Sequence, residues 1–367
     1  MLLTKKMKKN RISFLVILFI VAFLPTSCTT SQVVPSSQIS DTPTSIVGFN
    51  HIGISVQNLE KMLPFYLKAT GLEIVKREKV SHSKHADLIF GVKGIAYETV
   101  TLKAPNMLLE LTQFSNQAYA ELTKMPPQGP GMTHTCYQSP SWNSGYDKFL
   151  NSGADLLSRG DQPVDLGGYG VTYAYVYDYE GNMIELEQLD RSAFKRDGVD
   201  SLWLENNPMW MTQVALISSD LDKLVAFYQK VLDIPPYRMG QYGYENSRKF
   251  DDIVDMDDFE FKAAWFRMDR RSKMLELMQY VAPIETPNTT QVKSPTDLGY
   301  SFSIEVEDIQ AEYIRMKDLG VKFLSEPLIL GEFWMAFAND VDGNAFSLRQ
   351  ATSPASIYAI KNVEGKK

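Results

Sequence analysis

The sequence is poor in cysteine, histidine and positive charge. It holds two cysteines, Cys28 and Cys136, and four histidines among 367 residues. Because it has no CxxC pair, it contains no zinc-ribbon or thioredoxin-type motif, and at most one disulfide can form. Lysine and arginine number 37 against 44 acidic residues, which gives a formal net charge of −7 at pH 7. An acidic chain has no electrostatic reason to hold nucleic acid, so we expect no nucleic-acid partner.

Long hydrophobic runs are also scarce, and the one that stands out lies near the N-terminus. Residues 14–24 read FLVILFIVAFL, and they follow the basic residues Lys5, Lys6, Lys8, Lys9 and Arg11. A spanning helix needs about 20 apolar residues, so this run is too short for one and suits the core of a signal peptide. We therefore predict that residues 1–27 are a signal peptide.

The segment that ends this leader, LPTSC at 24–28, resembles the lipobox of bacterial lipoproteins. The resemblance implies that the mature chain begins at Cys28, carries lipid there, and is anchored at the outer membrane or the periplasmic face. The alternative is a plain secretory signal with a chance cysteine. Residues 28–45 are rich in Ser, Thr, Pro and Gln. Such a composition buries too little apolar area to order the chain, which predicts a flexible tether.

The rest of the chain is a duplication. The stretch that begins at His51 matches the stretch that begins at Gln213, with Phe65 matching Phe227 at the same offset of 162 residues. LELTQF at 109–114 returns as LELMQY at 275–280. DYEGNMIEL at 178–186 returns as DVDGNAFSL at 340–348. The second half therefore repeats the first half in the same order.

Each half in turn divides into two similar units. A unit opens with an alternating strand such as 48–56, continues with an amphipathic helix, and ends in strands joined by Gly-Asn turns. This pattern predicts an α+β fold of four βαβββ units in two tandem domains, at 46–190 and 208–351. The boundary falls near 191–207, and residues 352–367 form a polar tail.

Three stretches together resemble one family. They are FNHIGISVQNLEKMLPFY, GMTHTCY and YDYEGNMIELE, and the resemblance spans roughly 46–351. They are similar to the glyoxalase/bleomycin-resistance/extradiol-dioxygenase superfamily, also called the vicinal oxygen chelate superfamily. In that family two βαβββ units curl into a cup, and residues of the first and fourth strands bind a divalent metal ion.

The resemblance implies four metal ligands in the first half, namely His51, Glu110, His134 and Glu185. Strand alternation agrees, because His51 lies on the opposite face from Ile52 and Ile54, and the two glutamates stand between apolar neighbours. Imidazole and carboxylate donors suit Zn, Ni, Fe, Mn or Co.

The second half serves as an internal comparison for this ligand set. Three of the four expected ligands are replaced, by Gln213, by Ser301 (or Phe302, if the alignment shifts by one residue) and by Ser347, and Glu276 alone is retained. We therefore expect one metal ion, bound only in the first half, which would be the catalytic half.

The resemblance further implies a metal-dependent lyase or isomerase with glyoxalase-like or epimerase-like proton transfer, in which Glu110 or Glu185 is the base. Its partner would be a small oxygen-chelating substrate, and a homodimer is a further expectation. Two alternatives remain: a non-catalytic ligand-binding protein of the bleomycin-resistance type, and an extradiol-type dioxygenase. Residues 135–185 contain no histidine, which disfavours the dioxygenase. Export also conflicts with glutathione or coenzyme A substrates, so the substrate stays open.

Three smaller features each allow a functional interpretation and a purely structural one. His82 and His85 are either a second metal pair or part of a solvated loop, which is the favoured interpretation. Tyr173, Tyr175 and Tyr177 share one strand face and either line the cup or pack among themselves. Cys136 faces the same way as His134, and we favour a small wall residue over a metal or substrate contact.

Overall fold

The computed structural model describes residues 44–115, 121–197, 201–243, 248–268, 273–283 and 294–364. The predicted signal peptide, Cys28 and nearly all of the predicted tether lie outside these residues. Within the described residues, no helix combines the length and the apolar character that crossing a membrane requires.

Four βαβββ units follow one another along the chain, as the sequence predicts. The first half supplies units 1 and 2. Unit 1 consists of β1 (Ile46–Ser55), α1 (Leu59–Thr70), β2 (Glu73–Ser81), α2 (Lys84–Phe90), β3 (Ala96–Lys103) and β4 (Leu108–Phe114). Unit 2 consists of β5 (Gly131–Pro140), α3 (Gly145–Asn151), β6 (Asp155–Leu156), β7 (Val164–Asp165), β8 (Val171–Tyr177) and β9 (Met183–Leu189).

Two short helices, α4 (Arg191–Asp197) and α5 (Ser201–Asn206), lead into the second half. Unit 3 consists of β10 (Trp210–Ile217), α6 (Leu221–Leu232), β11 (Arg238–Gly243), α7 (Lys249–Val254), β12 (Glu260–Arg267) and β13 (Met274–Ala282). Unit 4 consists of β14 (Gly299–Val306), α8 (Ile309–Asp318), β15 (Lys322–Phe323), β16 (Leu328–Leu330), β17 (Phe333–Asn339) and β18 (Ala345–Ala351). Helix α9 (Ile360–Val363) lies in the predicted tail, which is therefore partly ordered.

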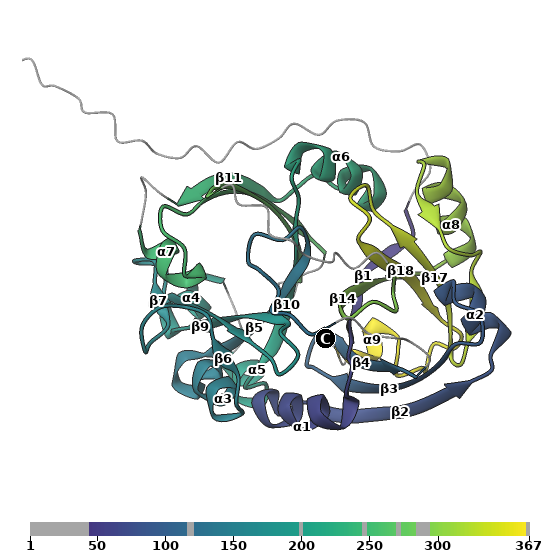
Figure 1. Cartoon of the computed structure of the whole chain (residues 1–367), viewed down its shortest axis with the longest axis horizontal. Coiled ribbons are helices and arrows are strands. Elements are labelled where there is room, and N and C mark those ends of the chain that lie inside the picture. The colour runs from purple at the N-terminus through teal and green to yellow at the C-terminus, as the bar shows by residue number, and fades with distance from the viewer. Residues whose placement is uncertain are drawn as a thin grey trace, which may run out of the picture. The chain divides into compact units, whose positions relative to one another are not determined.

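The units pair across the two halves of the sequence rather than within them. One nine-stranded sheet, in the order β15-β17-β18-β14-β1-β4-β3-β2 with β16 beside β17, joins units 1 and 4. The other nine-stranded sheet, in the order β11-β12-β13-β10-β5-β9-β8-β6 with β7 beside β8, joins units 2 and 3. We call these the outer cup and the inner cup, because the second sheet is contiguous in sequence and the first brackets it. Both curved sheets are visible in Figure 1, the inner cup in teal and green.

The sequence leaves open which units share a cup, and the structure pairs units from opposite halves. In the outer cup β1 runs antiparallel to β14, with Gly53 opposite Ser301. In the inner cup β10 runs antiparallel to β5, with Ala215 opposite His134. Both cups are complete within one chain, so a second copy is not needed to build either of them.

Helix-to-turn hydrogen bonds hold the two units of each half together. The Tyr66 hydroxyl on α1 donates to Asp178 Oδ2 over 2.8 Å, and Asp178 also accepts from the backbone N–H groups of Glu180 and Asn182. Tyr228 on α6 donates to Asp340 in the same way over 3.0 Å. The repeated Asp-x-x-Gly-Asn stretch therefore has a structural role, which is to order a turn and tie it to a helix of the other cup.

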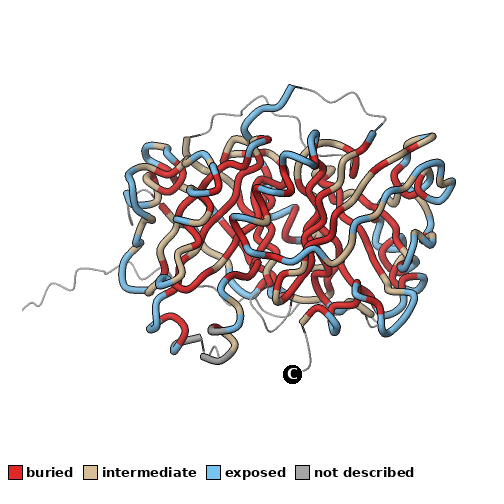
Figure 2. The backbone as a smooth tube through the Cα atoms, turned by 90° about the horizontal axis from the view of Figure 1, so that it is seen from below, coloured by how far each residue is buried: buried red, intermediate tan, exposed pale blue. Residues whose placement is uncertain are grey.

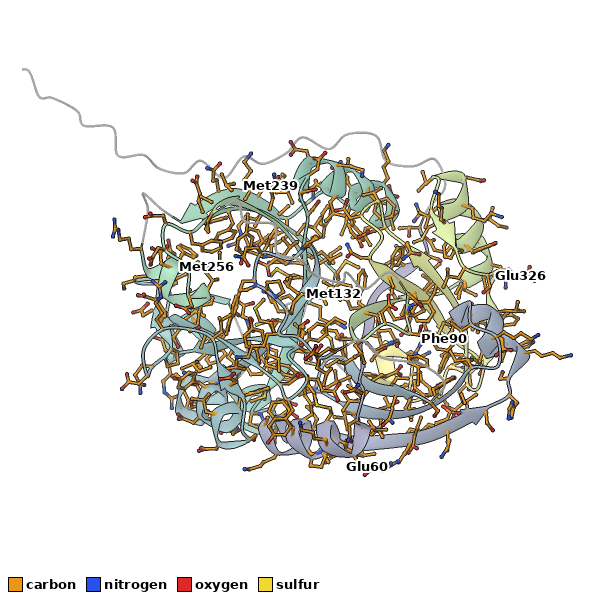
Figure 3. The ribbon with its side chains drawn as sticks, viewed as in Figure 1. Glu60, Phe90, Met132, Met239, Met256 and Glu326 are labelled. Carbon is orange, nitrogen blue, oxygen red and sulfur yellow. The ribbon has the colours of Figure 1, made fainter. Side chains whose placement is uncertain are left out.

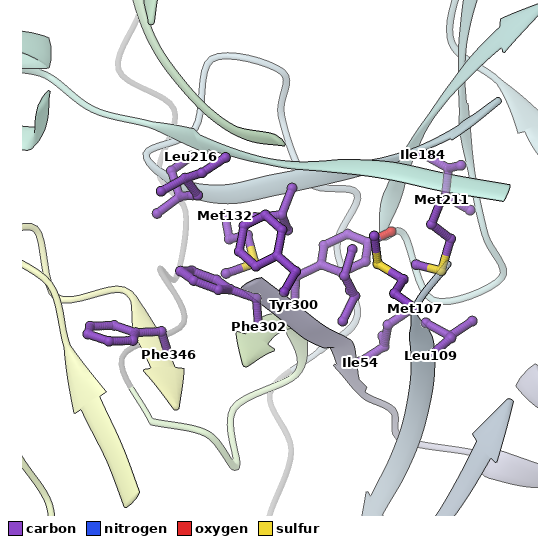
Figure 4. Packing of buried hydrophobic residues seen from close by; sticks show 14 of the residues in the cluster. Ile54, Met107, Leu109, Met132, Ile184, Met211, Leu216, Tyr300, Phe302 and Phe346 are labelled. Atoms are coloured by element: carbon purple, nitrogen blue, oxygen red, sulfur yellow. The ribbon is translucent and has the colours of Figure 1, made fainter. Parts of the chain in front are cut away.

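The helix-covered faces of both sheets share one apolar core. Its members include Ile54, Leu109, Ile184, Leu216 and Phe302, which come from both cups, as Figure 4 shows. Tyr300 of the outer cup also donates a hydrogen bond to the carbonyl oxygen of Met183 in the inner cup. Figure 2 shows buried residues running along the strands, with exposed residues at the periphery. The two cups are therefore joined through a single buried core.

A short helix covers the concave side of each cup. Helix α2 of unit 1 packs against β16 and β17 of unit 4, and α7 of unit 3 packs against β7 and β8 of unit 2. Phe90 of α2, labelled in Figure 3, belongs to a small aromatic cluster with Tyr97, Phe114 and Phe337.

We expect a fragment of residues 121–283 to fold and a fragment of residues 44–206 not to form a stable monomer. The first contains both partners of every strand pairing in the inner cup, whereas the second leaves β1 and β5 without β14 and β10. Unpaired strand edges associate with other chains, so the second fragment should dimerise or aggregate. Size-exclusion chromatography with urea unfolding checks this expectation. A monomeric fragment 44–206 that unfolds cooperatively would contradict the pairing.

Candidate metal centre

The four predicted ligands do not form one site. His51 on β1 and Glu110 on β4 lie in the outer cup, while His134 on β5 and Glu185 on β9 lie in the inner cup. Each residue faces the concave side of its sheet, as the strand alternation predicts. The error lies in the partner units, because strand pairing across the halves gives each predicted pair a different companion.

In the inner cup, His134 is joined by one carboxylate from each half. Its Nε2 atom lies 3.5 Å from Glu185 Oε2 and 3.5 Å from Glu276 Oε2 on β13. All three residues are buried, and His134 is only 1% exposed. His134 Nε2 has no hydrogen-bond partner among the described residues. One imidazole nitrogen and two carboxylate oxygens therefore converge within 4.8 Å of one another.

Gln213 completes this constellation from β10. Its Nε2 group donates to Glu185 Oε2 over 2.6 Å and to Glu276 Oε2 over 2.7 Å. The amide oxygen and nitrogen of a glutamine can exchange places by a half-turn of the side chain. Gln213 can therefore offer either a donor to the carboxylates or an oxygen ligand to a cation. In the sequence Gln213 counts as a lost ligand, but a carboxamide oxygen is itself a ligand for hard and borderline ions.

Thr133 and Tyr175 orient the imidazole ring of His134. Thr133 Oγ1 lies 3.0 Å from its Nδ1, and the ring of Tyr175 lies 5.0 Å from its own ring, centroid to centroid. When the threonine hydroxyl accepts from Nδ1–H, Nε2 is the ring nitrogen that is directed toward the carboxylates. Tyr175 thus lines the inner cup, as one of the two alternatives for the tyrosine stripe predicts.

The inner site carries an excess of buried negative charge. Burial by itself lowers the pKa of His134, but the two carboxylates of Glu185 and Glu276, each 3.5 Å from its Nε2, outweigh it and raise that pKa to about 9. Burial raises the pKa of Glu276. Burial, followed by the charge of Glu185, raises the pKa of Glu187 to about 8. Each shift favours a bound positive charge or proton, which is the electrostatic property of a cation site.

Cys136 is part of the wall beside these carboxylates. It is free and fully buried, and its Sγ atom lies within 4.8 Å of carboxylate oxygens of Glu185 and Glu187. Burial raises the pKa of its thiol well above the usual value, so it is protonated at neutral pH. A thiolate ligand is not favoured there, which agrees with the expectation of a wall residue.

The outer cup contains a built-in cation instead. Arg349 on β18 donates from Nη1 to Glu110 Oε1 over 2.8 Å and from Nη2 to Glu110 Oε2 over 2.9 Å. Its guanidinium carbon lies 3.9 Å from the ring centroid of Phe333, and the residue is 1% exposed. A buried guanidinium already occupies the position that a metal ion would need beside this carboxylate, so His51 and Glu110 do not form a metal site. Their assignment as ligands is therefore corrected.

His51 is held as a neutral imidazole in this cup. Asn50 Nδ2 donates to Glu305 Oε2 over 2.8 Å, which leaves Asn50 Oδ1 as the acceptor 3.0 Å from His51 Nδ1. His51 Nδ1 therefore carries the proton. Burial and then the charge of Arg349 lower the pKa of His51 to about 3, so its Nε2 faces Glu110 Oε2 at 3.3 Å without an ion pair at pH 7.

Sequence reasoning missed Gln213, Glu276 and Arg349 as members of these sites. Glu276 is recognisable as the retained ligand position, but the sequence places it in a half without a site. Arg349 stands at the same 162-residue offset from Glu187 that relates Ser347 to Glu185. The signal in the sequence for this built-in cation was an arginine, Arg349, two residues after Ser347, which occupies a lost ligand position.

The second histidine pair is not a metal site in the described part of the chain. His82 and His85 are exposed, and His85 is bonded to the carbonyl oxygen of Ile329. Neither residue joins a group of metal-capable side chains there. Both residues are solvated, as the favoured interpretation predicts, but only His82 lies in a loop, because His85 belongs to helix α2.

Comparison with known proteins supports the same family for both halves. Family models of the glyoxalase/bleomycin resistance protein/dioxygenase superfamily match residues 48–186 and 212–332. Ethylmalonyl-CoA/methylmalonyl-CoA epimerase of Cereibacter sphaeroides is 26% identical over 143 residues, which are 38% of this chain and 96% of that protein.

The fold has a solved counterpart that spans both halves. The crystal structure of glyoxalase I from Zea mays aligns with 83% of this chain and 92% of its own, with a TM-score of 0.55 and 19% identity. A second crystal structure, of a point mutant of the same maize protein, aligns over 83% and 93%, with a TM-score of 0.55 and 18% identity. At these identities the likeness establishes the fold alone.

We expect the Glu110–Arg349 pair to make stability sensitive to acid. Burial by itself raises the pKa of Glu110, but Arg349 outweighs burial and lowers it to about 2, from 4.5 in the unfolded chain. The stabilisation is therefore complete above about pH 5 and is lost as the pH falls toward 2. It amounts to about 3 kcal/mol at pH 7 and about 2 kcal/mol at pH 3.5. Urea unfolding of the wild type and Glu110→Gln at both pH values measures this difference.

The double variant Glu110→Gln with Arg349→Met is the control. It removes both charges, so it should be more stable than Glu110→Gln alone, which leaves the guanidinium buried and unpaired. A wild-type advantage over Glu110→Gln that stays constant between pH 7 and pH 3.5 would show that the pair contributes no such linkage.

Proposed function

The chain belongs to the glyoxalase/bleomycin resistance protein/dioxygenase superfamily, and we propose that it is a divalent-metal-dependent enzyme of this superfamily with its reaction centre in the inner cup. The observation that carries this proposal is the convergence of the buried donor atoms of His134, Glu185 and Glu276, with Gln213 bonded to both carboxylates. The proposed class is a lyase or isomerase that moves a proton next to a carbonyl group.

The residues of the inner cup fit a divalent ion. Two buried carboxylates with one imidazole leave negative charge uncompensated, and burying such charge without a partner is costly. A bound cation of charge +2 neutralises both carboxylates and gives His134 Nε2 the partner that it lacks within the described residues. His134, Glu185, Glu276 and Gln213 would hold the ion, and Zn, Ni, Fe, Mn or Co suit these donors.

When bound, the ion supplies Lewis-acid polarisation of the substrate oxygens. The chain's own residues would provide the proton transfer. Glu185 and Glu276 both bring a carboxylate oxygen close to His134 Nε2, so either of them could accept a proton from a substrate held at this point. Burial raises the pKa of Glu276, a direction that suits a carboxylate that accepts a proton. Tyr175 and helix α7 would exclude water from the reacting atoms.

The likeness to an epimerase supports proton transfer without naming the substrate. The relative from Cereibacter sphaeroides is named for acyl-CoA epimerisation, and coenzyme A thioesters are kept in the cytosol. An exported protein would not meet them routinely. We therefore propose a small substrate with two neighbouring oxygens and no thiol carrier.

We expect the inner-cup ligands to bind Zn²⁺ and the outer cup to bind none. His134→Ala with Glu276→Gln should abolish stoichiometric Zn²⁺ binding, because half of the donor set is gone. Thr133→Val should weaken affinity by about 10–100-fold, the usual cost of losing the hydrogen-bond partner of a histidine ligand. Metal analysis after dialysis, together with isothermal titration calorimetry, measures both effects.

The matched control for metal binding is His51→Gln in the outer cup. It should retain one Zn²⁺ per chain. Two ions per wild-type chain would place a metal ion in the outer cup. Loss of the ion in the single variant His51→Gln would do the same, and either result would contradict the proposal.

We expect turnover to depend on the inner carboxylates. Glu276→Gln or Glu185→Gln should reduce kcat/KM by about 10²–10⁴-fold, the range for loss of a general base. Glu98→Gln, a surface carboxylate bonded to Arg77, should leave turnover unchanged. The assay screens 2-oxo acids, hemithioacetals and catechols with the Zn, Ni, Mn and Fe(II) forms. Turnover of a catechol by the Fe(II) form alone would move the protein to the dioxygenase class, and tight metal-independent binding without turnover would favour sequestration.

We also propose that the protein is exported and anchored to a bacterial membrane through lipid on Cys28. The order of basic residues, apolar run, lipobox-like segment and Ser/Thr-rich tether supports this proposal. Labelled fatty acid should enter the wild type and not Cys28→Ala. A mature protein that keeps the residues before Cys28 would contradict it.

A further inference from the structure

The outer cup encloses a cavity that the proposed metal chemistry does not use. The cavity has a volume of about 70 Å³, and its wall includes His51, Tyr97, Glu110, Ser301, Arg349 and Tyr358. A buried water needs about 10–15 Å³ of such space, so there is room for roughly five waters or one compound of a few carbon atoms. Helix α2 contributes Phe90, labelled in Figure 3, to the wall.

The floor of this cavity is electrically balanced. The Arg349 guanidinium is matched by the Glu110 carboxylate, with each carboxylate oxygen bonded to one terminal nitrogen. The guanidinium is further fixed against the rings of Phe333 and Tyr358. Glu78 also lines the cavity, and the nearby Lys76 is bonded to Glu332, so the balance of charge rests on the Arg349–Glu110 pair. A charged ligand would lose its hydration there without meeting an unmatched opposite charge, which is unfavourable.

Two hydrogen-bond acceptors, His51 Nε2 and Glu110 Oε2, also face each other in the cavity with no hydrogen between them. His51 Nδ1 carries the ring proton because it faces Asn50 Oδ1, so its Nε2 is a bare acceptor. That atom lies 3.3 Å from Glu110 Oε2, which is also an acceptor. Two acceptors so close together attract a group that donates a hydrogen to the space between them, and a hydroxyl group does so without bringing charge.

Hydroxyl groups on the wall provide the remaining polar contacts. Tyr97, Ser301 and Tyr358 line the cavity, and within the described part of the chain their hydroxyls have no hydrogen bond to protein. Each of these hydroxyls can donate or accept. Phe90 and Phe333 are among the apolar residues of the wall, which suits the carbon skeleton of a small ligand.

We propose that the outer cup is a second, metal-independent binding site for a small neutral polyol. One ligand hydroxyl would donate to His51 Nε2 and Glu110, and others would pair with Tyr97, Ser301 and Tyr358. The balanced floor selects neutral ligands over ions. The site is distinct from the inner cup and does not rest on the proposed enzymatic function.

Binding to the full mature chain tests this proposal, in excess chelator so that no metal contributes. The probes are glycerol, its anionic analogue glycerate and its cationic analogue 3-amino-1,2-propanediol, measured by saturation-transfer NMR. Glycerol should bind saturably, and both charged analogues should bind at least about 10-fold more weakly. Tyr97→Phe and Ser301→Ala should each weaken glycerol by about 2- to 10-fold, the usual effect of one lost hydrogen bond.

The control variant is Ser347→Ala, which removes a buried hydroxyl from the same cup that does not line the cavity. It should leave glycerol binding unchanged. Absence of saturable binding, or equal binding by Ser301→Ala, Tyr97→Phe and the wild type, would overturn the proposal. Tighter binding of glycerate would overturn it in favour of an anion site at Arg349, and tighter binding of the amine in favour of a cation site. Because the metal is removed, none of these outcomes tests the inner cup.

Discussion

The antiparallel pairing of β1 with β14 and of β5 with β10 determines which side chains meet in this molecule. Each of these strands is the first strand of its unit, and each pairing joins units from opposite halves. Through the parallel neighbours β4, β13, β9 and β18, the pairings carry the ligand positions to the centre of each cup. The distances around His134 and around Arg349 are consequences of this arrangement.

Both cups bury an inward-facing carboxylate, and they differ in what balances its negative charge. A carboxylate on the fourth strand points inward in both, Glu110 in one and Glu276 in the other. In the outer cup the protein supplies the positive charge itself, through a guanidinium fixed by two hydrogen bonds and an aromatic face. In the inner cup a second carboxylate takes the place of a serine, and an imidazole and a carboxamide complete the set. Negative charge there exceeds what the protein balances, which is the physical basis for proposing a cation.

The sequence predicts which residues face into the cups. It does not predict which strands pair, and the composition of each site depends on that pairing. Period-two alternation places His51, Glu110, His134 and Glu185 on the concave faces, and the structure agrees. Alternation says nothing about which strand lies alongside, because β1 has the same inward residues whether it pairs with β5 or with β14. Gln213 is not an imidazole, so the sequence alone does not identify it as a ligand, and its role depends on its position beside two carboxylates. The role of Arg349 likewise depends on a contact with Glu110 across 239 residues.

The nested order of the cups has a consequence for how the chain acquires its structure during synthesis. The inner cup is complete once residue 282 has been made, and its central hydrogen bond from Thr135 to Gln213 spans 78 residues. The outer cup cannot close before unit 4 exists, since the Asn50–Glu305 bond spans 255 residues. At about 5–20 residues per second, β1 waits on the order of tens of seconds for its partner. A nascent chain of this topology therefore offers an open β1 edge until translation is almost finished, so the outer cup takes its final form only late in synthesis.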